Sequence, residues 1–274
     1  DFAPRLSFFF DAHIDFFEEI AKFRAARRIW ARWMRDRYGA TTDQAQWLRF
    51  HTQTAGVSLT AQQPENNVVR TAIEALAAVL GGTNSLHTNA LDEVLALPTE
   101  AAAEVALRTQ QVLLEETGVA SVIDPLGGSW FVEAATDRID AEAEALLAEI
   151  EALGDDGTMT SGIVAGIEKG WFTRHIADAA EAFQRDVDLG HRRVVGVNAH
   201  RATVSPPLEV LRVSQEVEHD QVQRLSERRQ RRDRTTVERT LATLAVAARG
   251  SENLVPPMLD AVRAEATVGE VCGV

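Results

Sequence analysis

The chain has 274 residues, 45% of them hydrophobic, which is enough to bury the core of at least one large domain. Its 41 acidic and 28 basic residues give a net charge of −13, which disfavours nucleic acid and anionic membranes as partners. The single cysteine, Cys272, excludes a disulfide framework and suits a reducing cytoplasm, and no apolar run of about 18 residues indicates a membrane span. The N-terminal stretch shows no signal-peptide pattern.

The first 120 residues alternate extended segments with helices. The stretch RLSFFF is typical of a strand, and apolar residues at helical spacing from Phe16 to Met34 predict a helix that ends near Tyr38, before Gly39. Extended segments are predicted at 5–10, 46–56 and 83–91, and helices at 16–38, 66–82 and 99–118. Strands that alternate with helices of this length indicate right-handed crossovers and a parallel sheet.

Helices dominate beyond residue 120. The stretch DPLGGSWFVE (124–133) predicts a turn followed by one short strand. Helices are then predicted at 134–153, 162–188, 208–229 and, after a Pro-Pro break, within 253–271. The basic run RRQRRDR (228–234) raises the alternative of nucleic-acid binding, but acidic residues precede it on the same helix, which favours a solvated, salt-bridged face.

Polar side chains accompany the predicted strands, where a buried sheet normally carries apolar ones. In a closed (β/α) barrel, polar residues at the C-terminal ends of strands face the ligand. The residues concerned are Arg5, Ser7, Arg49, Gln53, Thr83, Asn84, Ser85 and Thr88. Two cations and several neutral hydrogen-bonding groups suit an anionic, amide-rich ligand such as a coenzyme A thioester. The alternative is that Arg5 and Arg49 form ion pairs at the rim of the sheet.

The usual catalytic constellations are absent from the sequence. There is no GxSxG, HExxH or CxxC motif, and the glycine pairs lack a phosphate-loop lysine. His13, His51 and His87 each adjoin a strand end, where a histidine is more often structural than catalytic. If the chain is part of an enzyme, a cofactor must therefore carry the difficult chemistry.

Long stretches carry a family resemblance: APRLSFFFDAHIDFFEEIAKFRAARRIWARWM, LRFHTQTAGVSLTAQQPENNVVRTAIEALAAVLGGTNSLHTNALDEVLALPTE, DPLGGSWFVE and RRVVGVNAH. They resemble the adenosylcobalamin-dependent acyl-CoA mutases, the family of methylmalonyl-CoA and isobutyryl-CoA mutases. The resemblance implies an α/β fold: the second half of a TIM (β/α)8-type barrel followed by a mainly helical C-terminal extension. The implied segments are the C-terminal half-barrel (1–120), a barrel-associated helical segment (121–200) and a helical linker or tail (201–274).

The resemblance also implies roles for individual residues. Those expected to bind the acyl-CoA substrate are Arg5, Ser7, Arg49 and Asn84, and those expected on the cofactor side are Gln53, Gly56, Glu93 and Ala96. Asn84 stands where many family members have glutamine, so its amide has a shorter reach. No catalytic residue and no metal ligand is assigned, because the family's catalytic histidine lies on the first half of the barrel.

The implied function is that of the substrate-binding portion of a mutase large subunit, which rearranges the carbon skeleton of a branched acyl-CoA by radical chemistry. Adenosylcobalamin is the implied cofactor, but the cobalamin loop D-x-H-x-x-G is absent from the sequence. The expected partners are the acyl-CoA, a chain or segment that supplies the first half-barrel, a separate cobalamin-binding small subunit or domain, and further copies in an oligomer. The end at Val274 suits either a separate cobalamin subunit or a chain cut at a domain boundary. The alternative is a non-catalytic, mutase-derived interaction or assembly module.

Overall fold

A computed structural model describes residues 2–203 and 208–274, which form two compact units, Asp1–Leu211 and Arg212–Val274. The strands of the first unit are β1 (Phe8–Ala12), β2 (Phe50–Thr54) and β3 (Ser85–His87). Its helices are α1 (Phe16–Asp36), α2 (Asp43–Gln46), α3 (Asn67–Leu80), α4 (Glu100–Glu115), α5 (Trp130–Ala152), α6 (Met159–Glu168) and α7 (Trp171–Asp188). The fold is therefore α/β, mostly helical, with a small parallel sheet.

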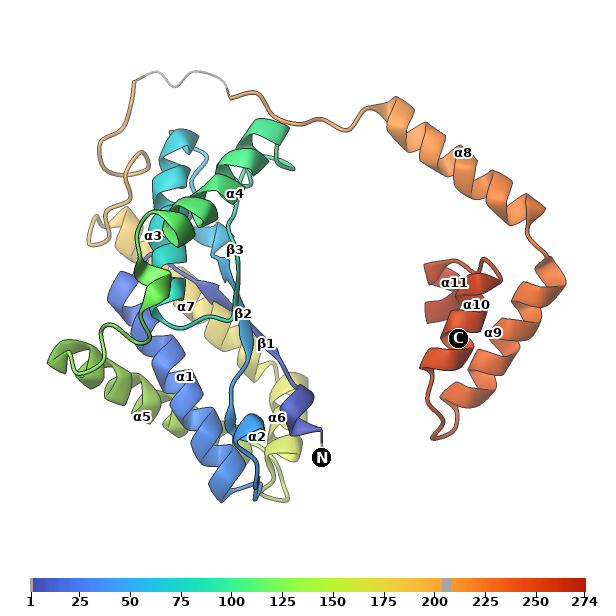
Figure 1. The fold of residues 1–274 in the computed structure, drawn as a ribbon, viewed down its shortest axis with the longest axis horizontal. Coiled ribbons are helices and arrows are strands. Elements are labelled where there is room, and N and C mark those ends of the chain that lie inside the picture. Colours follow the sequence, from blue (N-terminus) through green and yellow to red (C-terminus); the bar gives the residue numbers. More distant parts are fainter. Residues whose placement is uncertain (1, 204–207) are drawn as a thin grey trace. The chain divides into compact units, whose positions relative to one another are not determined.

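The three strands are parallel and follow one another in the order β1-β2-β3 (Figure 1). This confirms the parallel sheet predicted from the alternation of strands and helices. Each strand pairs with the next one along the chain, so right-handed crossovers place α1 and α3 on the same face. Among the described residues, helices α1 and α3 pack on the apolar face of the sheet, an arrangement consistent with a partial (β/α) barrel.

The core of this unit lies between the sheet and helices α1 and α3. Phe23 of α1 stacks on Phe50 of β2 with ring centroids 5.2 Å apart, and Phe10 of β1 meets Phe50 edge-on at 5.3 Å. Ala78 of α3 is fully buried in the same cluster. Aromatic rings on the strands and alanines on α3 let the helix approach the sheet closely. Because this face of the sheet is buried under the helices, the alternate residues of each strand point to the opposite face.

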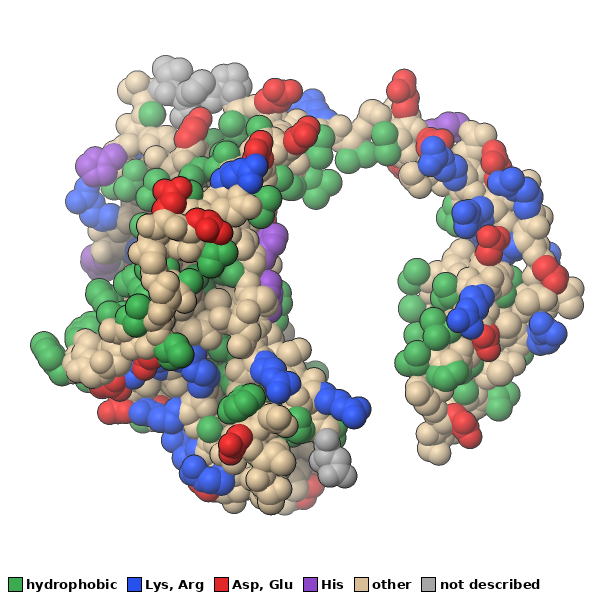
Figure 2. All heavy atoms as spheres, in the orientation of Figure 1, with side chains coloured by type: hydrophobic (Ala, Val, Ile, Leu, Met, Phe, Trp, Pro, Cys, Tyr) green, Lys and Arg blue, Asp and Glu red, His purple; other side chains and the backbone are tan. Residues whose placement is uncertain are grey.

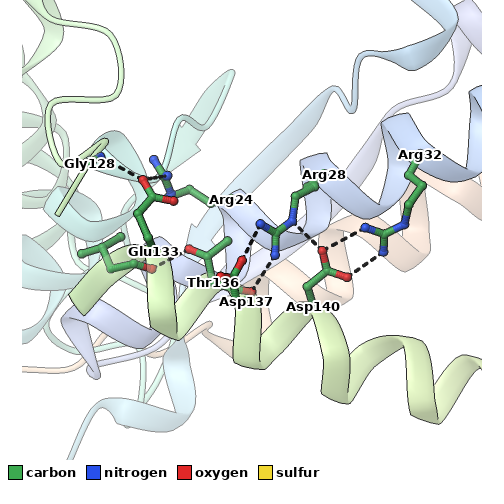
Figure 3. A network of polar contacts seen from close by, with 9 residues as sticks. Arg24, Arg28, Arg32, Gly128, Glu133, Thr136, Asp137 and Asp140 are labelled. Atoms are coloured by element: carbon green, nitrogen blue, oxygen red, sulfur yellow. Dashed lines mark hydrogen bonds and ion pairs between the residues drawn. The ribbon is translucent and has the colours of Figure 1, made fainter. Parts of the chain in front are cut away.

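Helix α5 is held against α1 by a ladder of ion pairs (Figure 3). Arg24, Arg28 and Arg32 follow one another at four-residue spacing on one face of α1. Arg24 donates to Glu133 at 2.6 Å, while Arg28 Nε and Arg32 Nη2 donate to Asp140 at 2.5 and 2.6 Å. The hydrogen bond from Arg32, and to a smaller extent that from Arg28, lowers the pKa of the Asp140 carboxyl. The ladder fixes the helical segment to the α/β part.

Two local predictions in the helical segment are wrong. No strand follows the turn at Gly128, because Trp130 begins α5 and Val132, in its first turn, packs into a buried cluster with residues of α1 and α3. The β-propensity of WFV is thus overridden by tertiary packing. The single helix predicted at 162–188 is two helices, since Gly170 adopts a left-handed conformation with φ 66° between α6 and α7.

The second unit contains α8 (Gln215–Arg231), α9 (Arg234–Ala248), α10 (Val255–Arg263) and α11 (Val268–Cys272). Within it, Arg232 donates to Glu270 at 2.5 Å, and Glu270 completes a capping box with Thr267. The two prolines of the predicted break lie in the first turn of α10, where proline is tolerated. The predicted 201–274 segment includes residues 204–207, which lie outside the described residues.

The basic run at the end of α8 is neutralised within its own unit. Acidic and basic side chains are interspersed along α8 (Figure 2), and Arg224 and Arg231 pair with the acids one turn earlier, Asp220 and Glu227. This arrangement is the salt-bridged face predicted from the sequence, and it leaves the nucleic-acid alternative without support. In the described part of the chain, no helix has both the length and the apolar character needed to span a membrane.

Candidate functional site

The uncovered face of the sheet is lined by polar and aromatic side chains. The register places two rows side by side across the three strands, and the members of these rows are Phe9, His51, Ser85, Asp11, Gln53 and His87. Phe9 keeps 59% of its surface exposed, although it is a phenylalanine on a strand. His51 Nδ1 lies 2.8 Å from Ser85 Oγ, and its ring packs 5.1 Å from that of Phe9. We call this surface the open face.

The four residues predicted to bind substrate all lie at the amino edge of the sheet. Arg5 ends a short 3-10 turn before β1, Ser7 and Arg49 directly precede β1 and β2, and Asn84 directly precedes β3. The expectation that these side chains lie at the C-terminal ends of strands is therefore wrong. The strands begin later than the alternating pattern suggested, because only residues from Phe8 onward pair with a neighbouring strand.

Hydrogen bonds fix two of these residues. Arg49 donates through Nη1 to the carbonyl oxygen of Pro4, so its half-buried guanidinium holds the segment that carries Arg5. The Asn84 carboxamide oxygen accepts the N–H of Phe50 at 2.9 Å and is thus committed to the start of β2. Neither Arg5 nor Arg49 forms an ion pair with a carboxylate of the described residues, 2–203 and 208–274. The ion pairs at the rim of the sheet, which were the alternative, are therefore not observed among these residues.

The four residues predicted on the cofactor side lie at the opposite, carboxyl edge. Gln53 is in β2, Gly56 begins the loop after it, and Glu93 and Ala96 lie in the turn between β3 and α4. A methyl group added at Gly56 would lie 3.5 Å from Glu93 Oε1 and 3.3 Å from the amide nitrogen of Asn89. Gly56 has no positive φ, so a side chain at this position would meet tight packing and not backbone strain.

Asn89 lies at the centre of this edge and was not identified from the sequence. Its side-chain oxygen accepts Gln53 Nε2 at 3.0 Å, and its backbone N–H donates to Thr54 Oγ1 at 2.9 Å. The residue is 2% exposed, yet its amide nitrogen finds no hydrogen-bond partner among the described residues. A buried donor without a partner is rare in folded proteins, so this nitrogen is available to a water, an ion or a ligand at the edge. The sequence offered no signal, since an asparagine after a strand is also typical of a turn.

The carboxyl edge fits a large polar cofactor on two observations. The buried Asn89 amide nitrogen has no hydrogen-bond partner among the described residues, and the Gly56 backbone carries no side chain beside Asn89 and Glu93. Partial burial raises the pKa of Glu93, with a further contribution from the Asp92 carboxylate and opposition from His87. A carboxyl in this position can accept hydrogen bonds from ligand hydroxyl groups.

Helix α3 places a stripe of buried polar side chains behind this edge, which the sequence analysis did not single out. Asn67, Thr71 and Glu74 share one helical face, and none of them is more than 2% exposed. Thr71 Oγ1 donates to the Asn89 carbonyl at 3.4 Å. Burial raises the pKa of Glu74 to about 8, although the Ser58 hydroxyl and the Ala55 backbone moderate the shift and the Glu19 carboxylate adds to it. We call these three residues the polar stripe.

A separate cavity of about 790 Å³ lies beside the carboxyl edge. It is bounded by the loops after β1 and β2, by α7 and by residues 192–197, and it holds none of the eight predicted site residues. A smaller, mainly apolar cavity of about 310 Å³ at the amino edge includes Asn84 in its wall. In the two described ranges, no group of three or more His, Cys, Asp or Glu side chains is arranged to hold a metal ion.

The small parallel sheet with helices packed on one face defines an α/β fold, which is consistent with a partial barrel. The family model for methylmalonyl-CoA mutase matches residues 1–274, and the chain belongs to that family. It is 46% identical to the methylmalonyl-CoA mutase of Rhizobium meliloti (strain 1021) over 99% of this chain and 37% of that protein. Identity to the 2-hydroxyisobutanoyl-CoA mutase large subunit of Aquincola tertiaricarbonis is 45%, over 99% of this chain and 47% of the relative. The human mitochondrial methylmalonyl-CoA mutase is 42% identical over 99% of this chain and 36% of its own length.

The chain spans between 36% and 47% of the length of the curated relatives it matches. The comparisons confirm the family that the sequence motifs indicated. The relatives include both methylmalonyl-CoA and 2-hydroxyisobutanoyl-CoA mutases at nearly equal identity, so family membership does not distinguish the acyl group.

Proposed function

We propose that the chain is the substrate- and cofactor-contacting part of an adenosylcobalamin-dependent mutase that rearranges a branched acyl-CoA. The observation that carries this proposal is the placement of two residue sets at opposite edges of one open face. The cationic set with Arg5 and Arg49 lies at the amino edge, and the set with Gly56 and Glu93 lies at the carboxyl edge. Such a face suits a long, polar, anionic ligand that meets a cofactor at one end.

The length of the face supports this division of roles. Gly56 is seven positions after Arg49, which at about 3.3 Å per extended residue is at most roughly 23 Å. A coenzyme A thioester has phosphates at one end and the reacting acyl group at the other. The amino edge would hold the phosphates by charge, and the polar rows of the open face would bind the amides of the chain between them.

The residues at the carboxyl edge would bind the cofactor. Adenosylcobalamin, when bound, supplies the organic radical that begins the rearrangement. Gly56 leaves room for the macrocycle, the Asn89 amide donates a hydrogen bond, and Glu93 accepts from hydroxyl groups. Gln53 holds Asn89 in place, and Ala96 adds little bulk to the turn that carries Glu93. The protein's remaining contribution is to exclude water from the radical.

The finer architecture belongs to the same proposal. Residues 1–120 would form the second half of a TIM-type barrel, 121–200 the helical segment packed on it and 201–274 the linker. An open sheet edge and a bare polar face support a partner segment that supplies the remaining strands. A cobalamin-binding domain or small subunit, an oligomeric assembly and a cytoplasmic location complete the expected setting, the last supported by the single cysteine.

The test measures the binding of acyl-CoA and of adenosylcobalamin to two variants of the complete mutase that contains this chain. Arg5→Ala should weaken acyl-CoA binding by about 1.5 to 3 kcal/mol, the range for a hydrogen bond to a charged group, and leave adenosylcobalamin binding unchanged. Gly56→Val should do the reverse. Arg138→Ala removes an exposed arginine of α5 and serves as the control for lost charge.

Calorimetry with each ligand alone separates the outcomes. If Arg5→Ala and Arg138→Ala bind acyl-CoA equally well, the amino edge does not contact the phosphates. If Gly56→Val loses acyl-CoA and keeps adenosylcobalamin, the assignment of the two edges is reversed. Absence of rearranged acyl-CoA from the unmodified, fully assembled enzyme would overturn the function itself.

A further inference from the structure

A single buried side chain joins the two loops that form the carboxyl edge. Asn67, the first residue of α3, is fully buried. Its amide nitrogen donates to the carbonyl oxygens of Thr60 and Leu91, at 3.0 and 2.9 Å. Its oxygen accepts the backbone N–H of Thr60 at 3.0 Å and Arg70 Nη1 at 2.8 Å. Four hydrogen bonds use both amide hydrogens and both oxygen lone pairs, so this carboxamide is fully satisfied.

The two loops are the ones that carry the candidate cofactor residues. Thr60 and Gly56 belong to the connection between β2 and α3, and Leu91 precedes Glu93 by two residues. Both loops are hydrogen-bonded to Asn67, and they come close again where a methyl group added at Gly56 would lie 3.5 Å from Glu93 Oε1. Arg70, one turn further along α3, also donates to Thr60 Oγ1 at 2.9 Å. The geometry therefore holds the loop after β2 and the turn after β3 from behind.

We infer that Asn67 is a positioning residue for the cofactor side of the site. It fixes the separation of Gly56 and Glu93 by binding the backbones of both loops, without touching the ligand itself. The inference rests on the proposed function for its ligand, but its structural part, the coupling of the two loops, does not. No other residue type meets these needs, because an aspartate offers no donor and a glutamine adds a methylene in a fully packed position.

The experiment uses Asn67→Asp in the complete mutase, with Asn67→Ser as a milder variant should the first fail to fold. Asn66→Asp is the matched control, since the neighbouring Asn66 amide donates to Gln63, at 3.0 Å, within its own loop. Hydrogen–deuterium exchange is followed in three regions: 55–60, 88–95 and helix α5. Calorimetry gives the affinities for adenosylcobalamin and for acyl-CoA separately.

We expect exchange to accelerate about tenfold in both loops and not in α5, with adenosylcobalamin bound about tenfold more weakly and acyl-CoA affinity unchanged. The Asn66 control should match the unmodified enzyme in every readout. Acceleration in α5 equal to that in the loops would show that Asn67 merely stabilises the fold. Unchanged exchange in either loop would overturn the coupling. If the unmodified enzyme binds no adenosylcobalamin, the proposed function fails while faster exchange in both loops still supports the coupling.

Discussion

The buried Glu74 carboxyl makes stability depend on pH in an unusual direction. Burial raises its pKa from 4.5 to about 8, so the folded protein holds the proton that the unfolded chain has already released at neutral pH. Neither carboxyl oxygen makes a hydrogen bond of good geometry in the described residues. The free energy of unfolding should therefore fall as pH rises from about 4.5 to about 8 and level off above it.

The perturbation that tests this is Glu74→Gln, which keeps the shape and removes the titration. At pH 7 the unfolded state of the native protein gains about 3 kcal/mol from releasing this proton, against less than about 1 kcal/mol at pH 5. Glutamine does not titrate, so the variant does not lose this stability. Its free energy of unfolding relative to that of the native protein should therefore rise by about 2 to 3 kcal/mol from pH 5 to pH 7. At roughly 2 to 4 °C per kcal/mol for a unit of this size, the difference in melting temperature should change by roughly 5 to 10 °C.

The assay is thermal melting of both proteins from pH 5 to pH 8, with Glu65→Gln as the control. Glu65 is an exposed glutamate nine residues earlier, and its replacement should leave the pH dependence as it is. A melting-temperature difference between Glu74→Gln and the native protein that stays constant over this range would refute the reasoning. That result would mean that the carboxyl is ionised in the folded state and that an unseen partner compensates its charge.

Two further predictions concern the helical segment. Asp140→Ala should cost about 1 to 3 kcal/mol of stability at pH 7, because Arg28 and Arg32 lose a shared partner while remaining partly hydrated. Since the pKa of Asp140 is lowered, its contribution is present above about pH 4 and is lost as pH falls through the folded pKa, so melting curves of variant and native protein should converge in acid. Gly162→Ala should cost about 2 kcal/mol or more, because the added carbon would lie 2.1 Å from a backbone carbonyl oxygen of α5. Gly269→Ala is the control, because nothing lies within 4 Å of the added carbon, and it should change stability by less than about 0.5 kcal/mol. Denaturant titration of both variants measures the two losses in unfolding free energy, and equal losses would contradict the prediction.

The order of strands and helices was predictable because each element carries its own periodicity. Helix α4 shows this at the level of a single residue, since Thr99 caps it by accepting the N–H of Ala102 at 3.3 Å, as its type and position predict. The start of the strands was not predictable in the same way. A strand exists only where a neighbour pairs with it, and Arg5 and Ser7 alternate correctly with apolar residues but have no paired strand beside them.

The family resemblance identified the residues of both edges but not the residues that hold them. Asn89 and Asn67 act through hydrogen bonds to loops that are distant in sequence, and no local pattern announces such bonds. Asn67 at the start of a helix resembles an ordinary cap, and Glu74 resembles the solvent-facing acid of an amphipathic helix. Their burial depends on the approach of strands and loops from elsewhere, which only the folded structure shows.

The order of residues along α3 explains how one helix serves both the core and the site. Because α3 returns between two parallel strands, it runs antiparallel to them, and its first turns lie at the carboxyl edge of the sheet. The polar members of its buried face, Asn67, Thr71 and Glu74, come first, and the buried alanines Ala75, Ala77 and Ala78 follow. The alanines allow close packing on the aromatic strands, whereas Asn67 and Thr71 hydrogen-bond the loops that carry the candidate cofactor contacts. Replacing Asn67 and Thr71 by alanine would extend the apolar packing but would leave loop backbone groups without partners, so the presence of these two residues is explained by the loops they hold and not by the stability of the core.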